Sequence, residues 1–337
     1  METEYAVTRL SAIKSRLPSA PELIRMLETA ETAQVAEALR FSPYGLEMDR
    51  LSPRGDAKPD PAKLVRVINE GSVRLRSSFG DLARTVDATL AEVLLMRWEV
   101  EEVKSTLRYL TFDGFALDRR FSFTSLVVNP ASMPMWGSYR SAPEFVSVLR
   151  KAGHPLTPAL DARAFALDPV EAELAISRHF YFEYLPVKAS KFPEALEYYR
   201  DRLDIANVCA AILLREFPAN RKESIARLIT GPGVVTADDI ALIAEGPQDA
   251  ALCVVKKRLG VTLKRGAETS ATILSMGLRR AFFRRYWMKS LLEPIGLWSL
   301  IFFMENMDAN AANLKLAISF SASHTPIGEA AESFIRV

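Results

Sequence analysis

The sequence predicts an all-α protein built from three similar helical units. The first observation is a short pattern of polar and aliphatic residues that occurs three times along the 337-residue chain. The second is a helix-start pattern that precedes each copy. The apolar residues of the predicted helices keep the three- and four-residue spacing of amphipathic helices. A content of 49% hydrophobic and 25% charged residues is typical of a folded protein with a substantial core.

The recurring pattern is a polar residue, a second polar residue three places later, and an aliphatic residue directly after it. The polar pairs are Glu99 with Glu102, Asp204 with Asn207, and Asn310 with Asn313. The aliphatic residues Val103, Val208 and Leu314 lie 105 and 106 residues apart. An ordinary amphipathic helix explains any single copy, but a nearly constant period indicates internal duplication. We therefore expect the six polar residues to have a structural role in the repeat.

Helix-capping patterns mark where each unit begins its helices. A Ser or Thr followed three residues later by an acidic residue is typical of a capping box, in which both side chains satisfy backbone donors. The pattern occurs at Ser19–Glu22, at Ser141–Glu144 and, more weakly, at Thr236–Asp239. Together with the motif copies, these starts divide the chain into predicted units of residues 1–137, 138–233 and 234–337.

The helices and loops of the first unit follow from apolar spacing and helix breakers. The expected helices span residues 5–17, 20–30, 32–41 and 62–109. Residues 52–61 are rich in turn formers and predict a loop. We expect an interruption of the long helix at Ser77–Gly80. Residues 111–140 are the least regular part of the chain, and loops of this length are often functional.

The second and third units are predicted in the same way. The expected helices span residues 169–184, 193–217, 248–259, 270–292 and 294–321, with further helix starts at Ser141 and Thr236. The glycine-rich turn 230–233 separates the two units. The longest apolar run, Pro294–Met304, has eleven residues, whereas a membrane-spanning helix needs about 20. The chain is therefore not expected to enter a bilayer.

Charge and cysteine content exclude several classes of function. Forty-three basic and forty-one acidic residues leave a net charge of +2, so no overall field favours nucleic acid or an anionic membrane. Cys209 and Cys253 lie in apolar surroundings without a CxxC pattern and are expected to be buried free thiols. The acidic N-terminus lacks the features of a secretory signal, so a cytoplasmic location is expected.

No catalytic, cofactor-binding or metal-binding pattern stands out. The chain contains no G-x-x-x-x-G-K-[ST], G-x-G-x-x-G, G-x-S-x-G or H-E-x-x-H motif. His154, His179 and His324 are far apart in sequence and have no evident nucleophile beside them. We expect a protein that is not an enzyme and that needs no cofactor or metal.

A basic segment within the predicted helix 270–292 is the main candidate for partner binding. Arg279, Arg280, Arg284 and Arg285 alternate with aromatic residues along this helix. A helix with a solvated cationic face explains the pattern without a partner. The functional interpretation is a docking face for an acidic protein or for lipid headgroups beside a membrane.

The motifs taken together resemble a known family. The matching segments are Tyr5–Ile13, the Ser19–Glu22 helix start, Glu99–Lys104, Asp204–Val208 with residues 230–233, Glu293–Ile295 and Ala312–Lys315. In this order they resemble the C subunit of archaeal and bacterial V/A-type rotary ATPases, called subunit d in eukaryotic vacuolar pumps. Glu102 and Cys209 depart from the family pattern, in which Asn and a basic residue are usual.

The resemblance implies a fold and a role. The family has three helical domains that form a funnel with pseudo-threefold symmetry, and it has no catalytic residues. Its members bind the membrane rotor ring on the cytoplasmic face and receive the end of the rotor shaft, one copy per complex. The implied role is a socket in the central stalk of a proton- or sodium-translocating ATPase or ATP synthase. Two alternatives remain open: a helical repeat scaffold that binds other proteins, and a helical enzyme with an unrecognised site.

Overall fold

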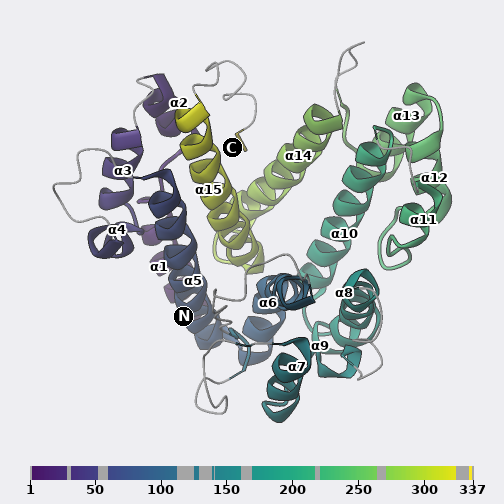
Figure 1. Ribbon diagram of the computed structural model, residues 1–337, viewed down its shortest axis with the longest axis horizontal. Coiled ribbons are helices and arrows are strands. Elements are labelled where there is room, and N and C mark those ends of the chain that lie inside the picture. The colour runs from purple at the N-terminus through teal and green to yellow at the C-terminus, as the bar shows by residue number, and fades with distance from the viewer. Residues whose placement is uncertain are drawn as a thin grey trace.

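The computed structural model contains helices and connecting turns. It describes residues 2–28, 32–51, 60–111, 125–128, 139, 141–160, 169–216, 221–263, 271–323 and 334–335. No β-strand occurs within these ranges, which confirms the prediction of an all-α protein. The helices gather into three groups around the centre of the molecule (Figure 1). The division into three repeated domains stays a prediction.

The first group combines the beginning and the end of the chain. It contains α1 (Glu2–Lys14), α2 (Ala20–Glu28), α3 (Thr32–Phe41), α4 (Gly45–Leu51), α5 (Pro61–Val86) and the last helix, α15 (Leu297–Ser323). The helix α15 packs against α1, α2, α3 and α5 (Figure 1). The last helix of the chain therefore packs against the first segment of the chain.

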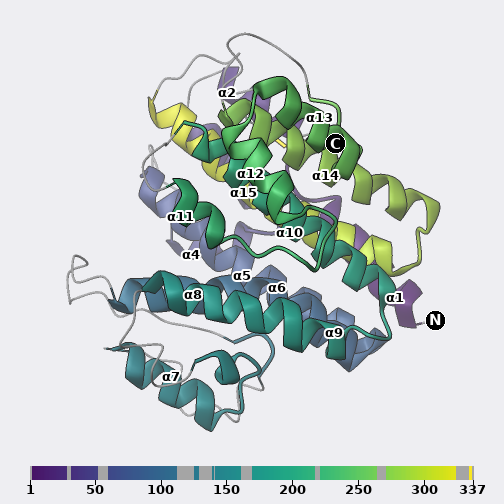
Figure 2. The ribbon, with the colours of Figure 1, turned by 90° about the vertical axis from the view of Figure 1, so that its right-hand side faces the viewer.

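The second group is built on α6 (Ala88–Thr111). Its other elements are α7 (Ala142–Lys151), the 3-10 turn η2 (Thr157–Ala159), α8 (Pro169–Arg178), the π-helical turn η4 (His179–Tyr184) and α9 (Leu185–Lys188). The elements α8, η4 and α9 continue as one rod beside α6 (Figure 2).

The third group is built on α10 (Pro193–Leu214). It also contains α11 (Arg221–Ala226), α12 (Ala237–Glu245), α13 (Gln248–Leu259) and α14 (Ala271–Leu292). The helix α14 packs against both α10 and α15, so it joins the third group to the first.

The three helices that carry the repeated motif pack in a cyclic order. The helix α6 packs on α7 and α8, α10 packs on α12 and α14, and α15 packs on α1, α2 and α3. Each motif helix thus contacts helices from the following segment of the chain, and the last one contacts the first segment. The helix α6 also packs on α5, and α15 also packs on α5 and α14. This arrangement closes the chain into a ring.

The predicted helix starts are confirmed. Thr236 and Asp239 form both hydrogen bonds of a capping box at the start of α12. The Ser19 N–H donates to Glu22 Oε2 at 2.7 Å. At the start of α7, Ser141 Oγ accepts from the Glu144 N–H at 3.4 Å. These caps satisfy backbone donors that the first helical turn leaves without partners.

The predicted interruption at Ser77–Gly80 is wrong, because α5 runs without a break from Pro61 to Val86. Gly80 serves close packing instead of a turn, since a Cβ atom there would lie 2.9 Å from Leu95 Cδ1 on α6. The break comes at Asp87, whose Oδ1 accepts a hydrogen bond from the Leu90 N–H at 2.9 Å and so caps α6.

One cluster of buried apolar residues runs through all three groups of helices and includes Tyr286 of α14 in the third group. Phe79 of α5 packs edge to face on Trp98 of α6, with ring centres 5.6 Å apart, and stacks on Phe303 of α15 at 6.1 Å.

Among the described residues, every helix is too short or too polar to cross a bilayer. Cys209 is buried as expected, but Cys253 is exposed because α13 buries the opposite face, through Ala251 and Val255.

Candidate functional site

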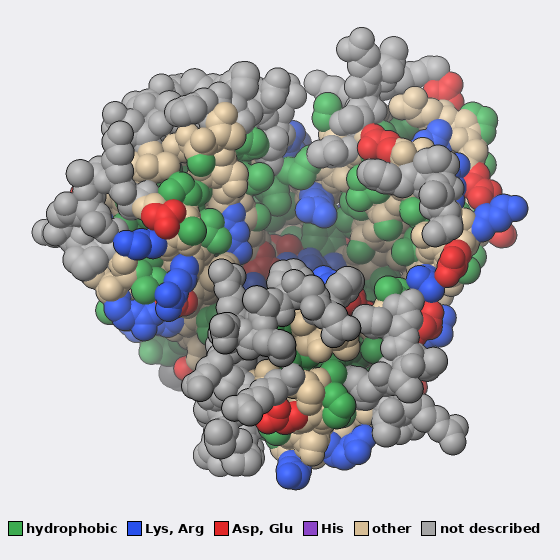
Figure 3. All heavy atoms as spheres, in the orientation of Figure 1, with side chains coloured by type: hydrophobic (Ala, Val, Ile, Leu, Met, Phe, Trp, Pro, Cys, Tyr) green, Lys and Arg blue, Asp and Glu red, His purple; other side chains and the backbone are tan. Residues whose placement is uncertain are grey.

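A cavity of about 740 Å³ lies between the three groups of helices. Residues of α6, α8, α10, α14 and α15 line it. Figure 3 shows a hollow between three lobes, with acidic and basic side chains gathered at its bottom. The cavity is therefore a concave site to which distant parts of the sequence contribute, as is common for binding sites.

Residues at equivalent repeat positions face this cavity. Glu101, Ala206 and Ala312 each precede the aligned aliphatic residue by two places, and all three line the cavity and are exposed. Four residues earlier, at the same position of each copy, the cavity is lined by Arg97, Arg202 and Asp308. A spacing of four keeps residues on one face of a helix. The three motif helices therefore turn the same face toward the cavity.

Four charged residues form the bottom of the cavity, and we call them the floor cluster: Arg97, Arg202, Glu305 and Asp308. Arg97 Nη2 lies 2.5 Å from Asp308 Oδ2, and Arg97 Nη1 lies 2.6 Å from Glu305 Oε1. Arg202 Nη1 lies 3.2 Å from the same Glu305 oxygen. Arg97 and Glu305 are buried, with side chains 5% and 9% exposed. The cluster joins α6, α10 and α15 at one point.

Neighbouring side chains hold the two carboxylates in place. Trp98 Nε1–H donates to both Asp308 oxygens, at 2.9 and 3.0 Å, and the Tyr198 hydroxyl donates to Glu305. Arg76 of α5 lies 3.5 Å from Asp308 Oδ1, with its guanidinium carbon 5.1 Å from the centre of the Trp98 ring. Such a cation–π contact adds to the electrostatic attraction.

The surroundings favour the charged forms of Arg97 and Asp308. Burial raises the pKa of the Asp308 carboxyl, but the charges of Arg97, Arg76 and Arg202 outweigh burial, and the pKa stays below its usual value. Burial and the nearby Arg202 lower the pKa of Arg97, yet Asp308 and Glu305 leave it raised. The Arg97–Asp308 pair is therefore ionised at neutral pH.

The first polar residue of the first motif copy ties α6 to two other segments. Glu99 Oε2 accepts a hydrogen bond from the Leu126 N–H at 2.9 Å. His154 Nδ1 accepts from the Leu156 N–H at 3.2 Å, so Nε2 carries the ring proton and donates to Glu99 Oε1 at 2.8 Å. Glu99 and His154 are both buried.

The equivalent residues of the other two copies also bind backbone groups. Asp204 accepts hydrogen bonds from the N–H groups of Val234 and Val235 at 2.8 and 3.2 Å. Burial raises the pKa of Asp204 even though these two bonds lower it. Asn310 Nδ2–H donates to the carbonyl of Pro18, which fixes the last helix to the first segment of the chain.

The second polar residues of two copies make matching contacts. Asn207 Nδ2–H donates to the Ile229 carbonyl at 2.7 Å, and Asn313 Nδ2–H donates to the Ile335 carbonyl at 2.9 Å. The Ile335 N–H also donates to Asn313 Oδ1 at 2.9 Å. Both asparagines thus hold a backbone group 22 residues further along the chain.

Glu102 of the first copy differs from the two asparagines. Its side chain is 42% exposed and lies 3.2 Å from Arg76 Nη1. Asn207 and Asn313 are buried at this repeat position, whereas Glu102 is partly exposed. A charged carboxylate therefore takes the place of asparagine in the copy where this position reaches solvent.

The basic segment of α14 does not form a single surface. Arg279 is exposed and lines the cavity. Arg280 Nε–H donates to the Phe334 carbonyl at 3.0 Å. Arg285 lies 2.6 Å from Asp201 and also donates to the Leu259 carbonyl. Arg284 is exposed. Arg280 and Arg285 are therefore engaged within the molecule, and the partner-binding role of all four arginines stays a prediction.

His179 does not line the central cavity. His179 Nδ1 lies 2.8 Å from Glu183 Oε2, and its Nε2 lies 3.0 Å from the Pro155 carbonyl. His324 lies outside the described residues.

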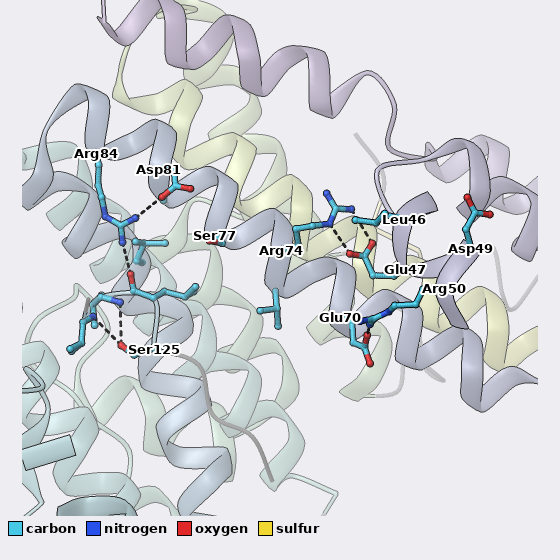
Figure 4. Close-up of a pocket in the computed structure, with 16 residues that line it drawn as sticks. Leu46, Glu47, Asp49, Arg50, Glu70, Arg74, Ser77, Asp81, Arg84 and Ser125 are labelled. Carbon is cyan, nitrogen blue, oxygen red and sulfur yellow. Dashed lines mark hydrogen bonds and ion pairs between the residues drawn. The ribbon is translucent and has the colours of Figure 1, made fainter. Parts of the chain in front are cut away.

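A second cavity, of about 1050 Å³, lies on the outer side of α5, against α4 and residues 125–128. In Figure 4, Arg84 lies beside Asp81, and the other paired side chains lie beside α4. Arg74 pairs with Glu47, and Arg50 pairs with Glu70. Arg84 donates to the Leu126 carbonyl at 2.7 Å. Although this cavity is larger, its charges serve local pairing, and the central cavity is the stronger candidate.

Sequence reasoning missed the floor cluster, although the repeat contained the signal for it. Arg97, Arg202 and Asp308 precede Val103, Val208 and Leu314 by six places in each copy. Extending the alignment by one helical turn beyond the polar pairs identifies them. Glu305 has no such equivalent among the charged residues, because Leu94 and Tyr199 occupy its position in the other copies.

Comparison with known proteins gives the chain its family. The sequence model of the family described as ATP synthase (C/AC39) subunit matches residues 6–319. No individual curated protein matches the chain. The match extends over nearly the whole sequence, so it includes all three copies of the motif and the floor cluster. The chain belongs to the ATP synthase (C/AC39) subunit family.

Proposed function

We propose that the protein is the central-stalk socket of a V/A-type ATPase or ATP synthase, which links the rotor shaft to the membrane rotor ring. In this proposal the central cavity receives the end of the shaft, and the opposite end of the molecule rests on the ring. The protein carries out no catalysis itself. It is present once per complex, at the inner face of the cell membrane, and the ring carries protons or sodium ions.

The observation that carries the proposal is the central cavity together with family membership. Long helices from all three groups line the cavity, and ion pairs close its floor. A socket that passes torque has to be stiff, and a packed interior resists deformation. The continuous core between Phe79, Trp98 and Phe303 supports such stiffness.

Co-purification tests the proposal. We expect an affinity-tagged chain, isolated from detergent-solubilised membranes of the source cells, to bring the shaft and ring subunits with it in fixed proportion. A tagged chain that carries Arg284→Glu serves as a matched variant, because Arg284 is exposed. Its weaker retention of the ring would support the membrane-side docking role of the basic segment. Purification of the wild-type chain alone, or with unrelated proteins, would favour a general helical scaffold.

A further inference from the structure

We infer that the floor cluster is a clasp that closes the ring of helices and so fixes the shape of the cavity, and that Asp308 is its key residue. This inference rests on the proposed function only where it concerns the shaft that the cavity would hold in the complex. The clasp itself is a property of the isolated chain and can be tested there.

The repeat makes the charge of Asp308 significant. Arg97, Arg202 and Asp308 occupy the same position in the three motif copies, and the fold brings all three to the cavity floor. If all three copies carried arginine at this position, three arginines would meet at the cavity floor. They would repel one another, because like charges at short range are unfavourable in a partly buried site. The third copy carries an acidic residue instead. One change of sign therefore turns repulsion into attraction.

The last motif helix uses two carboxylates to reach both of the other motif helices. Glu305 and Asp308 are three residues apart, so they share one face of α15. Asp308 pairs with Arg97 of α6, and Glu305 pairs with Arg97 and with Arg202 of α10. The helix α15 also packs along α1, α2, α3, α5 and α14, and it packs on α10. The floor cluster is thus where α15 engages α6 and α10 by charge.

Specificity is the expected gain from such a cluster. Removing charges from water offsets most of their attraction, so a buried ion pair adds little net stability. It does require one arrangement of its partners, because any other arrangement leaves a buried charge alone. A ring that must close in a single register around a partner benefits from this property.

The test measures the width of the ring in the full chain. Cys209 and Cys253 are replaced by serine, and spin labels are attached through cysteines at Leu46 of α4 and Leu242 of α12, which are 68% and 40% exposed. The distance between these labels spans the first and third groups of helices. We expect a narrow distribution of label-to-label distances in the otherwise wild-type chain. In Asp308→Arg we expect a broader distribution with a longer mean distance, and we expect the increase in the mean to exceed the width of the wild-type distribution.

Two further variants keep the test decisive. Arg108→Glu makes the same type of charge reversal outside the cavity lining, at the Arg108–Glu173 pair, which joins α6 to α8 at 2.7 Å. The Arg108 side chain is 55% exposed, and we expect no shift in the distance. Asp308→Asn removes the charge but keeps an acceptor for Trp98, and it replaces Asp308→Arg in the test if that variant does not fold. We expect Asp308→Asn to broaden the distribution of label-to-label distances. An unchanged distribution in a folded Asp308 variant would overturn the clasp, whether or not the chain binds shaft and ring subunits.

Discussion

Replacing Arg97 by methionine is expected to lower the free energy of unfolding by about 3–5 kcal/mol, because it leaves buried charges without their main partner. Glu305 is 9% exposed and would keep its ion pair with Arg202 at 3.2 Å. Asp308 would keep Arg76 at 3.5 Å. Chemical denaturation followed by circular dichroism measures the difference.

Arg108→Met provides the matched control. Arg108 also forms an ion pair from α6, with Glu173, but its side chain is 55% exposed. Solvent screens an exposed pair, so we expect a loss of about 0–1 kcal/mol. Equal losses in the two variants would show that burial of the floor cluster has no special energetic consequence.

Filling the cavity is expected to prevent assembly without unfolding the chain. Ala206 and Ala312 are exposed on the cavity wall, so tryptophan at either position projects into the space proposed for the shaft. We expect Ala206→Trp and Ala312→Trp to weaken association with the shaft subunits at least tenfold, which corresponds to about 1.4 kcal/mol. Binding of purified shaft subunits, with thermal unfolding of each variant, measures this effect.

Ala12→Trp is the control for added bulk. Ala12 is also an exposed alanine on a helix, but it lies on α1 and does not line the cavity. We expect this variant to bind the shaft subunits like the wild-type chain. Normal binding by both cavity variants would mean that the shaft does not enter the cavity.

Local signals in the sequence were sufficient for most of the helices. The capping patterns at Ser19, Ser141 and Thr236 depend on residues three places apart, so the sequence reveals them directly. Gly80 was misread because its role depends on contact with Leu95 of another helix. Local preference for a break loses to tertiary packing at this position.

The candidate site was harder to predict because it depends on how distant segments meet. The basic segment of α14 looked like one surface, but Arg285 turns to Asp201 and Arg280 to the Phe334 carbonyl. The motif residues were predictable as a repeated set. Their backbone partners, such as Ile229 and Ile335, were not, because only the fold brings them within reach.

Photo-cross-linking from the cavity wall tests the central claim most directly. A photoreactive amino acid at position 312 of the tagged chain is activated in membranes that contain the assembled complex, and the attached partner is identified by mass spectrometry. The account predicts attachment to a shaft subunit from position 312 and none from position 12 on α1. Attachment from position 312 to the ring or to an unrelated protein, with the shaft unlabelled, would contradict it.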